Sequence, residues 1–216
     1  MDGWSALILA AGAGRRFGGS KLLADLAGVP VIRRTAEAVL SAGFGEVVVA
    51  TGAAHPAITA ALDGLACRIV PAPEWQEGMA ASLRAGLVAL GTPERGVFVF
   101  LGDMPLVPVA LCASLADLAA EAGYAARPRV GGQPGHPAAF TRAAFPDLVR
   151  LTGDTGAAAL LKGRIEGVAY LDTSDTGAVL DIDSPADLAA AVAAWNACAT
   201  SATSDSAISR GALPKP

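Results

Sequence analysis

Short apolar runs alternate along this chain with alanine- and leucine-rich amphipathic stretches, and this alternation restricts its fold more than any other feature. Repeated strand-helix-strand units place parallel strands side by side with helices packed on both faces. The sequence therefore predicts a single-domain α/β fold with a mostly parallel central sheet. The expected strands are residues 5–11, 46–51, 68–71, 97–101, 168–171 and 178–182, and the expected helices are residues 31–41, 56–62, 79–90, 108–122 and a final helix after Ser184.

Two segments interrupt the alternation. The segment from about residue 127 to residue 162 is rich in proline and glycine, so we expect irregular loops there, and such loops often carry substrate contacts. After Cys198 the chain lacks a periodic apolar face. We therefore expect one domain over residues 1–198 and a disordered tail over residues 199–216.

The overall composition argues against several classes of partner. The net charge of −4 argues against a nucleic acid that must be held by a basic surface. No stretch approaches the roughly 20 apolar residues that cross a bilayer, so we expect no membrane partner. The three cysteines, Cys67, Cys112 and Cys198, lack the paired spacing of a zinc site or a disulfide framework. A cytoplasmic location is therefore expected.

A glycine-rich turn follows the first predicted strand and is itself followed by cationic side chains. Gly12 and Gly14 allow the main chain to approach a ligand closely and to direct amides at its oxygens. Arg15, Arg16 and Lys21 can neutralise the remaining charge. This arrangement suits a bound phosphate group.

Three interpretations of this turn compete. A nicotinamide-dinucleotide site requires G-x-G-x-x-G and an acidic residue at the end of the second strand, where this chain has Thr51 and Gly52. A Walker-type loop requires Gly-Lys-Ser/Thr, whereas the order here is Ser20-Lys21. The third interpretation is a turn that only links a strand to a helix, with solvated arginines.

The first loop resembles the opening signature of nucleotidyltransferases of the molybdenum-cofactor type. The resemblance implies a Rossmann-like, three-layer fold and a nucleoside triphosphate bound on this loop, with Arg16 and Lys21 as catalytic residues. Relatives that transfer guanylyl groups usually carry glycine at the position of Ala11, so the resemblance favours CTP over GTP. The matching residues are Leu9, Ala10, Ala11, Gly12, Arg16, Phe17, Gly18 and Lys21, and the implied nucleotide-binding residues are Leu9, Ala10, Ala11, Gly12, Ala13, Gly14 and Lys21.

Two aspartate motifs are candidates for binding a metal ion. Asp103 follows the apolar run of residues 97–101, and ligands of open α/β sheets collect at the carboxyl ends of strands. Asp181 and Asp183 follow the run near residue 180, where strand alternation would direct both to the same side. Mg²⁺ prefers carboxylate oxygens completed by water and phosphate. Simple turn and capping roles stay open for these aspartates, but the resemblance implies Asp103 as a catalytic metal ligand and Asp183 as its partner.

The helix expected at residues 79–90 begins beside Gly78. The free amides at a helix amino end suit an anion or a base carbonyl, and Ser82 adds a hydroxyl group. An ordinary first helical turn would have the same sequence. The resemblance implies that Gly78 and Ser82 contact the nucleotide.

Two further segments are assigned to the acceptor only through the resemblance. These are Gly135-His136-Pro137 and the turn around Asp154, so His136 and Asp154 are the candidate acceptor-binding residues. Relatives often carry a basic residue in place of Pro134 and an arginine in place of Ala158.

The resemblance implies transfer of CMP from CTP to the phosphate of molybdopterin, with Mg²⁺ as cofactor and release of pyrophosphate, as in molybdenum cofactor cytidylyltransferases. A molybdoenzyme or a cofactor-insertion protein would be the partner. Two alternatives stay open: transfer to another phosphorylated acceptor such as a sugar phosphate, and a noncatalytic protein that carries or inserts a pterin cofactor.

Overall fold

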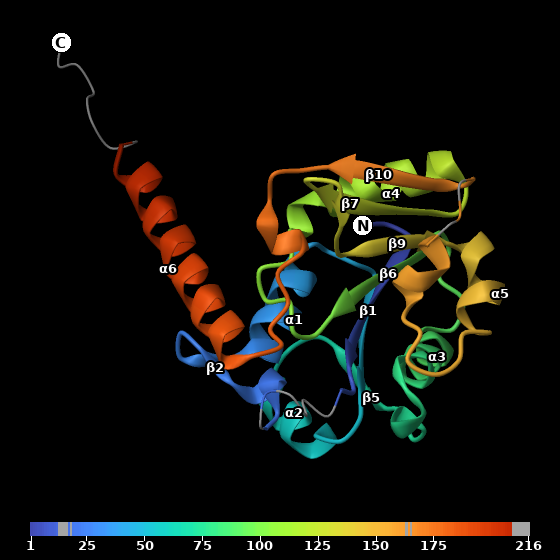
Figure 1. Cartoon of the computed structure of the whole chain (residues 1–216), viewed down its shortest axis with the longest axis horizontal. Helices are drawn as coiled ribbons and strands as arrows, with labels where there is room; N and C mark the ends of the chain where they lie inside the picture. The colour runs from blue at the N-terminus through green and yellow to red at the C-terminus, as the bar shows by residue number, and fades with distance from the viewer. Residues whose placement is uncertain (13–16, 18, 163, 165, 209–216) are drawn as a thin grey trace, which may run out of the picture.

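The computed structural model describes residues 1–12, 17, 19–162, 164 and 166–208. Within them a central sheet has the strand order β10-β7-β9-β6-β1-β4-β5, with β8 paired to β7 (Figure 1). A separate hairpin is formed by β2 (Asp25–Leu26) and β3 (Val29–Pro30). The sheet strands are β1 (Trp4–Ala10), β4 (Glu46–Thr51), β5 (Arg68–Pro71), β6 (Gly96–Leu101), β7 (Ala125–Val130), β8 (Gln133–Pro134), β9 (Ala138–Thr141) and β10 (Val168–Asp172).

Most neighbouring strands in this sheet run parallel. β1 pairs in parallel with both β4 and β6, β4 pairs with β5, and β7 pairs with β10. Only β9 and the short β8 run in the opposite direction. The predicted α/β fold with a mostly parallel sheet is confirmed.

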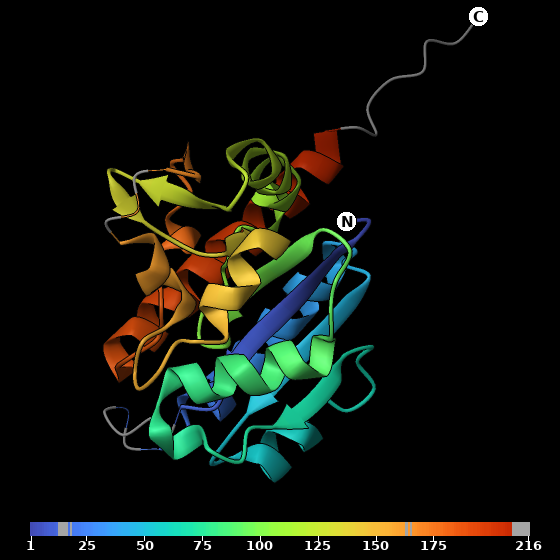
Figure 2. The ribbon, with the colours of Figure 1, turned by 90° about the vertical axis from the view of Figure 1, so that its right-hand side faces the viewer.

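Helices cover both faces of the sheet, because alternate residues of its buried strands point to opposite sides. Ile8 of β1 packs in one hydrophobic cluster with α1 (Val31–Ser41), α2 (His55–Ala61) and α4 (Cys112–Ala122). Leu7 packs in a second cluster with α3 (Met79–Leu90) and α5 (Phe145–Leu148). Figure 2 shows α3 lying across the face of the sheet opposite α1. Short 3₁₀ turns occupy Lys21–Leu23, Trp75–Glu77, Val109–Leu111, Arg142–Ala144, Ala157–Leu161 and Thr176–Ala178.

The last helix, α6 (Pro185–Ile208), begins where the sequence predicts it. Its first turns pack through Ala191 against Leu26, Val31 and Ile182, and the Arg34 guanidinium lies 4.4 Å from the ring centroid of Trp195. Farther along, α6 runs outward from the rest of the molecule (Figure 1). The helix crosses residue 198, and the division into a domain and a tail there stays a prediction.

Two predictions of secondary structure are wrong. Residues 178–182 form no strand: their main chain bonds to loops, with the Ala178 carbonyl accepting from His136 and the Ile182 amide donating to Asp103. The alternation expected for Asp181 and Asp183 is therefore absent. The segment expected to be irregular contains β7, β8, β9 and α5. The sequence does not reveal these elements, because alanines and prolines interrupt the alternating apolar pattern of a strand.

Candidate active site

A pocket of about 430 Å³ opens at the carboxyl ends of β1 and β6, within the roughly 300–1,000 Å³ typical of small-molecule sites. In parallel α/β sheets this edge is where ligands bind. The pocket is lined by Leu9, Ala10, Ala11, Gly12, Phe17, Lys21, Leu22, Trp75, Gln76, Gly78, Met79, Ser82, Leu101, Asp103, Asp154 and Asp183.

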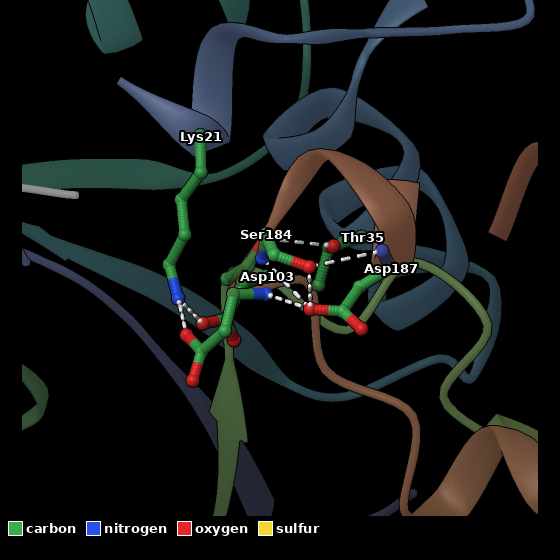
Figure 3. Close-up of polar contacts among 7 residues, drawn as sticks. Lys21, Thr35, Asp103, Ser184 and Asp187 are labelled. Carbon is green, nitrogen blue, oxygen red and sulfur yellow. Dashed lines mark hydrogen bonds and ion pairs between the residues drawn. The ribbon is translucent and has the colours of Figure 1, made fainter. Parts of the chain in front are cut away.

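Lys21 lies between two carboxylates from distant parts of the chain. Its Nζ is 2.6 Å from Asp103 Oδ2 and 2.5 Å from Asp183 Oδ1 (Figure 3). Burial lowers the pKa of Lys21, but the hydrogen bonds and charges of the two aspartates outweigh it, so the net pKa is raised. The ammonium therefore stays charged and holds the two carboxylates together.

The same two carboxylates fit a divalent cation. Asp103 Oδ1 is buried without a hydrogen-bond partner, so this oxygen has an unused site for a ligand. Carboxylate oxygens are hard ligands of the kind Mg²⁺ and Mn²⁺ bind. Within the described ranges no group of three or more His, Cys, Asp or Glu side chains could hold a metal ion, so such a cation would complete its coordination with substrate oxygens and water.

Asp103 is positioned by the strand that precedes it and by two main-chain contacts. It follows Gly102, whose carbonyl accepts a 3.0 Å hydrogen bond from the buried Thr35 hydroxyl of α1. The Asp103 carbonyl in turn accepts from the Ile182 amide at 3.1 Å. This second bond joins the Asp103 turn directly to the segment that carries Asp183.

Asp183 is positioned by the start of α6. The Asp187 carboxylate accepts from the amides of Asp183 and Ser184 at 3.1 and 2.7 Å, and the Ser184 hydroxyl exchanges hydrogen bonds with Asp187. This is a capping box, which satisfies amides at the helix start. Hydrogen bonds from Ser184 and Asp183 lower the pKa of Asp187, so the cap is formed at neutral pH.

At another part of the pocket, the main chain at Gly78 lies directly against the main chain at Gly153. Gly78 has φ 115°, and a Cβ there would lie 2.3 Å from the Gly153 carbonyl carbon. The Ala80 amide also donates to the Gly153 carbonyl at 3.1 Å. Only glycine permits this approach. Asp154 is thereby brought beside Gly78 and Ser82.

The structure places most of the residues predicted for the site in this one pocket. His136 is an exception: it lines a second pocket, apart from Asp154, so the two predicted acceptor-binding residues do not lie together. Ala13, Gly14 and Arg16 lie outside the described residues. The predicted residues that line the first pocket are Leu9, Ala10, Ala11, Gly12, Lys21, Gly78, Ser82, Asp103, Asp154 and Asp183.

Several lining residues were not predicted from the sequence. Trp75 and Gln76 belong to the 3₁₀ turn before Gly78. Their position just before the predicted start of a helix is the feature of the sequence that could have indicated them as pocket residues. Met79 and Phe17 adjoin predicted residues and carry no chemical signal of their own.

No helix in the described part of the chain is long and apolar enough to cross a membrane.

Two curated proteins are similar in sequence to this chain over most of its length. Nicotine blue oxidoreductase of Paenarthrobacter nicotinovorans is 32% identical over 188 residues, covering 83% of this chain and 91% of that protein. Purine catabolism protein PucB of Bacillus subtilis is 29% identical over 192 residues, with 83% and 91% covered.

Solved structures are also similar to this chain over most of its length. The crystal structure of Rv0371c from Mycobacterium tuberculosis superposes with a TM-score of 0.77 at 30% identity, covering 88% of this chain and 97% of that chain. A manganese complex of Rv0371c superposes with a TM-score of 0.75 at 27% identity, with 88% and 97% covered. The family described as the MobA-like NTP transferase domain matches residues 6–173. The chain therefore belongs to the MobA-like NTP transferase family.

Proposed function

We propose that this protein transfers CMP from CTP to the phosphate group of molybdopterin and releases pyrophosphate. The observation that carries the proposal is the convergence of Lys21, Asp103 and Asp183 in the pocket that the Leu9 to Gly12 segment also lines. A cationic side chain and a pair of metal-binding carboxylates facing a glycine turn suit a triphosphate.

The proposed reaction needs alignment more than proton transfer. An oxygen of the acceptor phosphate attacks the α-phosphorus of CTP, and the bond from that phosphorus to the bridging oxygen of pyrophosphate breaks. The nucleophile is already an anion, so no general base is required. Main-chain amides near Gly12 and the Lys21 ammonium would stabilise the leaving pyrophosphate. A bound Mg²⁺ ion, held by Asp103 and Asp183, would supply neutralising charge to phosphate oxygens.

The choice of CTP rests on Ala11. Its Cβ lies 2.9 Å from the position a Cβ on Gly52 would occupy, and Trp75 Cγ lies 2.8 Å from that position. The methyl group thus adds bulk beside Trp75, another residue of the pocket wall. A smaller base fits a narrower pocket, so Ala11→Gly should raise the use of GTP relative to CTP.

A second candidate, an oxidation or a reduction, is raised by the name of the 32% identical relative. A nicotinamide cofactor would be the usual hydride carrier for such a reaction. The end of β4, where a dinucleotide site carries an acid, holds Thr51, whose hydroxyl bonds to His55 Nδ1 and to the Val70 carbonyl. This favours nucleotidyl transfer.

A pyrophosphate-release assay tests the proposal. The four common triphosphates would be combined with Mg²⁺ or Mn²⁺ and with molybdopterin, a sugar phosphate or no acceptor, and NADH and NADPH oxidation would be followed in parallel. Pyrophosphate release that requires both CTP and molybdopterin is the expected result. Release only with a sugar phosphate, NAD(P)H oxidation without release, or binding of the pterin cofactor without release would each replace the proposed function with one of its alternatives.

The proposed setting is the cytoplasm, with a molybdoenzyme or a cofactor-insertion protein receiving the product. Co-purification of the protein with such a partner from cell extract would support this part of the proposal.

A further inference from the structure

The segment after α5, residues 151–154, reaches the first turn of α3, where two hydrogen bonds hold it (Figure 2). The Ala80 amide donates to the Gly153 carbonyl at 3.1 Å, and Arg84 Nη1 donates to the Leu151 carbonyl at 2.9 Å. Ala80 and Arg84 are four residues apart, so they lie on the same side of the helix. This side of α3 therefore holds a segment that contributes to the lining of the first pocket.

The Arg84 guanidinium also reaches the turn that precedes α3. Its Nη2 lies 3.4 Å from Glu74 Oε2 and 3.7 Å from Glu77 Oε2. These two carboxylates stand on either side of Trp75 and Gln76, which line the pocket. A guanidinium presents five donors in a rigid planar fork, so one side chain can bond to several partners at once. Arg84 thereby joins three stretches of the pocket wall: the turn, the start of α3 and the segment after α5.

Among these contacts, the bond to the Leu151 carbonyl has the largest effect on position. The side chains of Glu74 and Glu77 are 65% and 63% exposed, and exposed ion pairs contribute little to stability because water screens them. The bond to Leu151 is part-buried and has an ordinary length. A charged donor also makes a stronger bond than a neutral one. Removal of Arg84 should therefore release residues 151–154 more than it releases the turn.

The wall joined by Arg84 is separate from the charged side of the pocket. Lys21, Asp103 and Asp183 belong to the segment after the glycine turn, the end of β6 and the start of α6. In the described part of the chain, Arg84 is outside the pocket lining. It can act on a ligand only through the residues that it holds in place.

Loop residues lose conformational entropy when they become ordered. A wall that is ordered before the ligand arrives spares the ligand this cost and so raises affinity. We propose that Arg84 is a positioning residue for the nucleoside triphosphate, because it holds residues 74–79 and 151–154 as one preformed wall beside the bound nucleotide. This inference rests on the proposed function and deepens it, since it assigns a residue outside the pocket to nucleotide affinity.

Triphosphate binding in the absence of an acceptor tests the inference on the full chain. Calorimetric titration of the wild type with the four common triphosphates and Mg²⁺ identifies the one that binds most tightly. Arg84→Met keeps most of the side-chain stem and removes its donors. It should weaken binding of that triphosphate by about fivefold to tenfold, the order expected for one hydrogen bond with a charged donor.

The kinetic effect of Arg84→Met should fall on binding and not on turnover. In the transfer assay the KM for the triphosphate should rise by the same factor, while kcat stays within about twofold of the wild type. Mn²⁺ affinity without nucleotide should be unchanged, because Asp103 and Asp183 belong to other segments. A residue needed only for folding would not produce this division.

Arg68→Met is the matched control. Arg68 pairs with Glu46 at 2.8 Å and donates to the Ala89 carbonyl at the far end of α3, so it contacts the same helix away from the pocket. This variant should bind the triphosphate as the wild type does. Amide hydrogen exchange gives a second measurement: the Ala80 amide should exchange at least about tenfold faster in Arg84→Met and at the wild-type rate in Arg68→Met.

Equal triphosphate affinity in the two arginine variants would overturn the inference. A fall in kcat or in Mn²⁺ affinity as large as the rise in KM would also overturn it, because the whole site would then be affected. Should Arg84→Met fail to fold, Arg84→Lys decides the question. Its compact ammonium keeps the charge but cannot span the three partners as the fork does, so triphosphate binding should weaken by at least about twofold. Wild-type affinity in Arg84→Lys would then overturn the inference.

The outcomes for this inference and for the proposed function are distinct. Weaker triphosphate binding by Arg84→Met, in a protein whose wild type transfers nothing to molybdopterin, would keep the inference and overturn the proposed transfer. Transfer by the wild type together with equal affinities of the two variants would do the reverse. A wild type that binds none of the four triphosphates would overturn both.

Discussion

Lys21 occupies the place between Asp103 and Asp183 that the sequence analysis assigned to a metal ion. One ammonium group already satisfies an oxygen of each carboxylate. A metal cation bound between those oxygens would lie close to the Lys21 ammonium, and the two positive charges would repel each other. Metal binding and a movement of Lys21 toward the triphosphate should therefore be coupled.

Lys21→Met tests this coupling through two effects of opposite sign. Removing the ammonium should tighten Mn²⁺ binding in the absence of nucleotide by at least about tenfold, because the carboxylates lose a competing cation. The same change should weaken CTP binding. Electron paramagnetic resonance of free Mn²⁺ and a CTP titration measure the two effects, with the exposed Lys162→Met as control. Unchanged Mn²⁺ affinity in the Lys21 variant would show that the ammonium and the metal do not compete.

Asp103→Ala should abolish most activity without unfolding the protein. It deletes the carboxylate whose Oδ1 is buried and unpartnered, and turnover should fall by roughly 10²–10³-fold or more. Lys21 keeps its contact with Asp183, so the thermal melting curve should stay cooperative. Near-normal pyrophosphate release by a folded variant would remove Asp103 from the reaction.

The helices and strands that could be predicted from the sequence are those whose apolar pattern matches their burial in the fold. Asp103 was found because it ends β6, whose strand pattern is strongly apolar. β7 was missed because Arg127 and Pro128 interrupt a strand that β9 and β10 cover on either side. Contacts between loops place Lys21 between the two carboxylates and place Asp181 and Asp183 in different pockets. Such contacts produce no periodic pattern in the sequence, so they could not be predicted from it.

The start of α6 connects helix stability to the site. Ser184→Ala removes the hydroxyl that bonds to Asp187 and should cost about 1 kcal/mol of unfolding free energy. Because Asp183 precedes this cap directly, the variant should also bind Mn²⁺ more weakly. Thermal melting and Mn²⁺ titration check both effects. Thr59→Ala, which removes a hydroxyl bonded within α2, serves as the control. Equal Mn²⁺ affinity in the two variants would show that the Ser184 cap does not affect metal binding.

For the molecule as a whole, His136 links stability to pH. Its pKa is about 4 in the folded chain against 6.5 in the unfolded chain. Between these values the unfolded state binds the proton and the folded state does not. Stability is therefore fully present above about pH 6.5 and is lost as the pH falls toward 4, by on the order of 3 kcal/mol.

Urea unfolding of the wild type and of His136→Gln at about pH 7 and about pH 4.5 measures this contribution. The variant should lose less stability than the wild type over this range, since glutamine does not titrate. Parallel pH profiles for the two proteins would mean that His136 is already accessible to protons in the folded state.

The main-chain bond from Ile182 to Asp103 has a consequence for shortened versions of the chain. The family match ends at residue 173, just after the last residue of β10, so a chain cut there keeps every strand of the central sheet. It would nevertheless lack Asp183 and the bond that fixes the Asp103 turn. Such a fragment should retain the sheet's circular dichroism signal and lose its affinity for Mn²⁺, because the residues after 173 supply one of the two carboxylates of the proposed ion site.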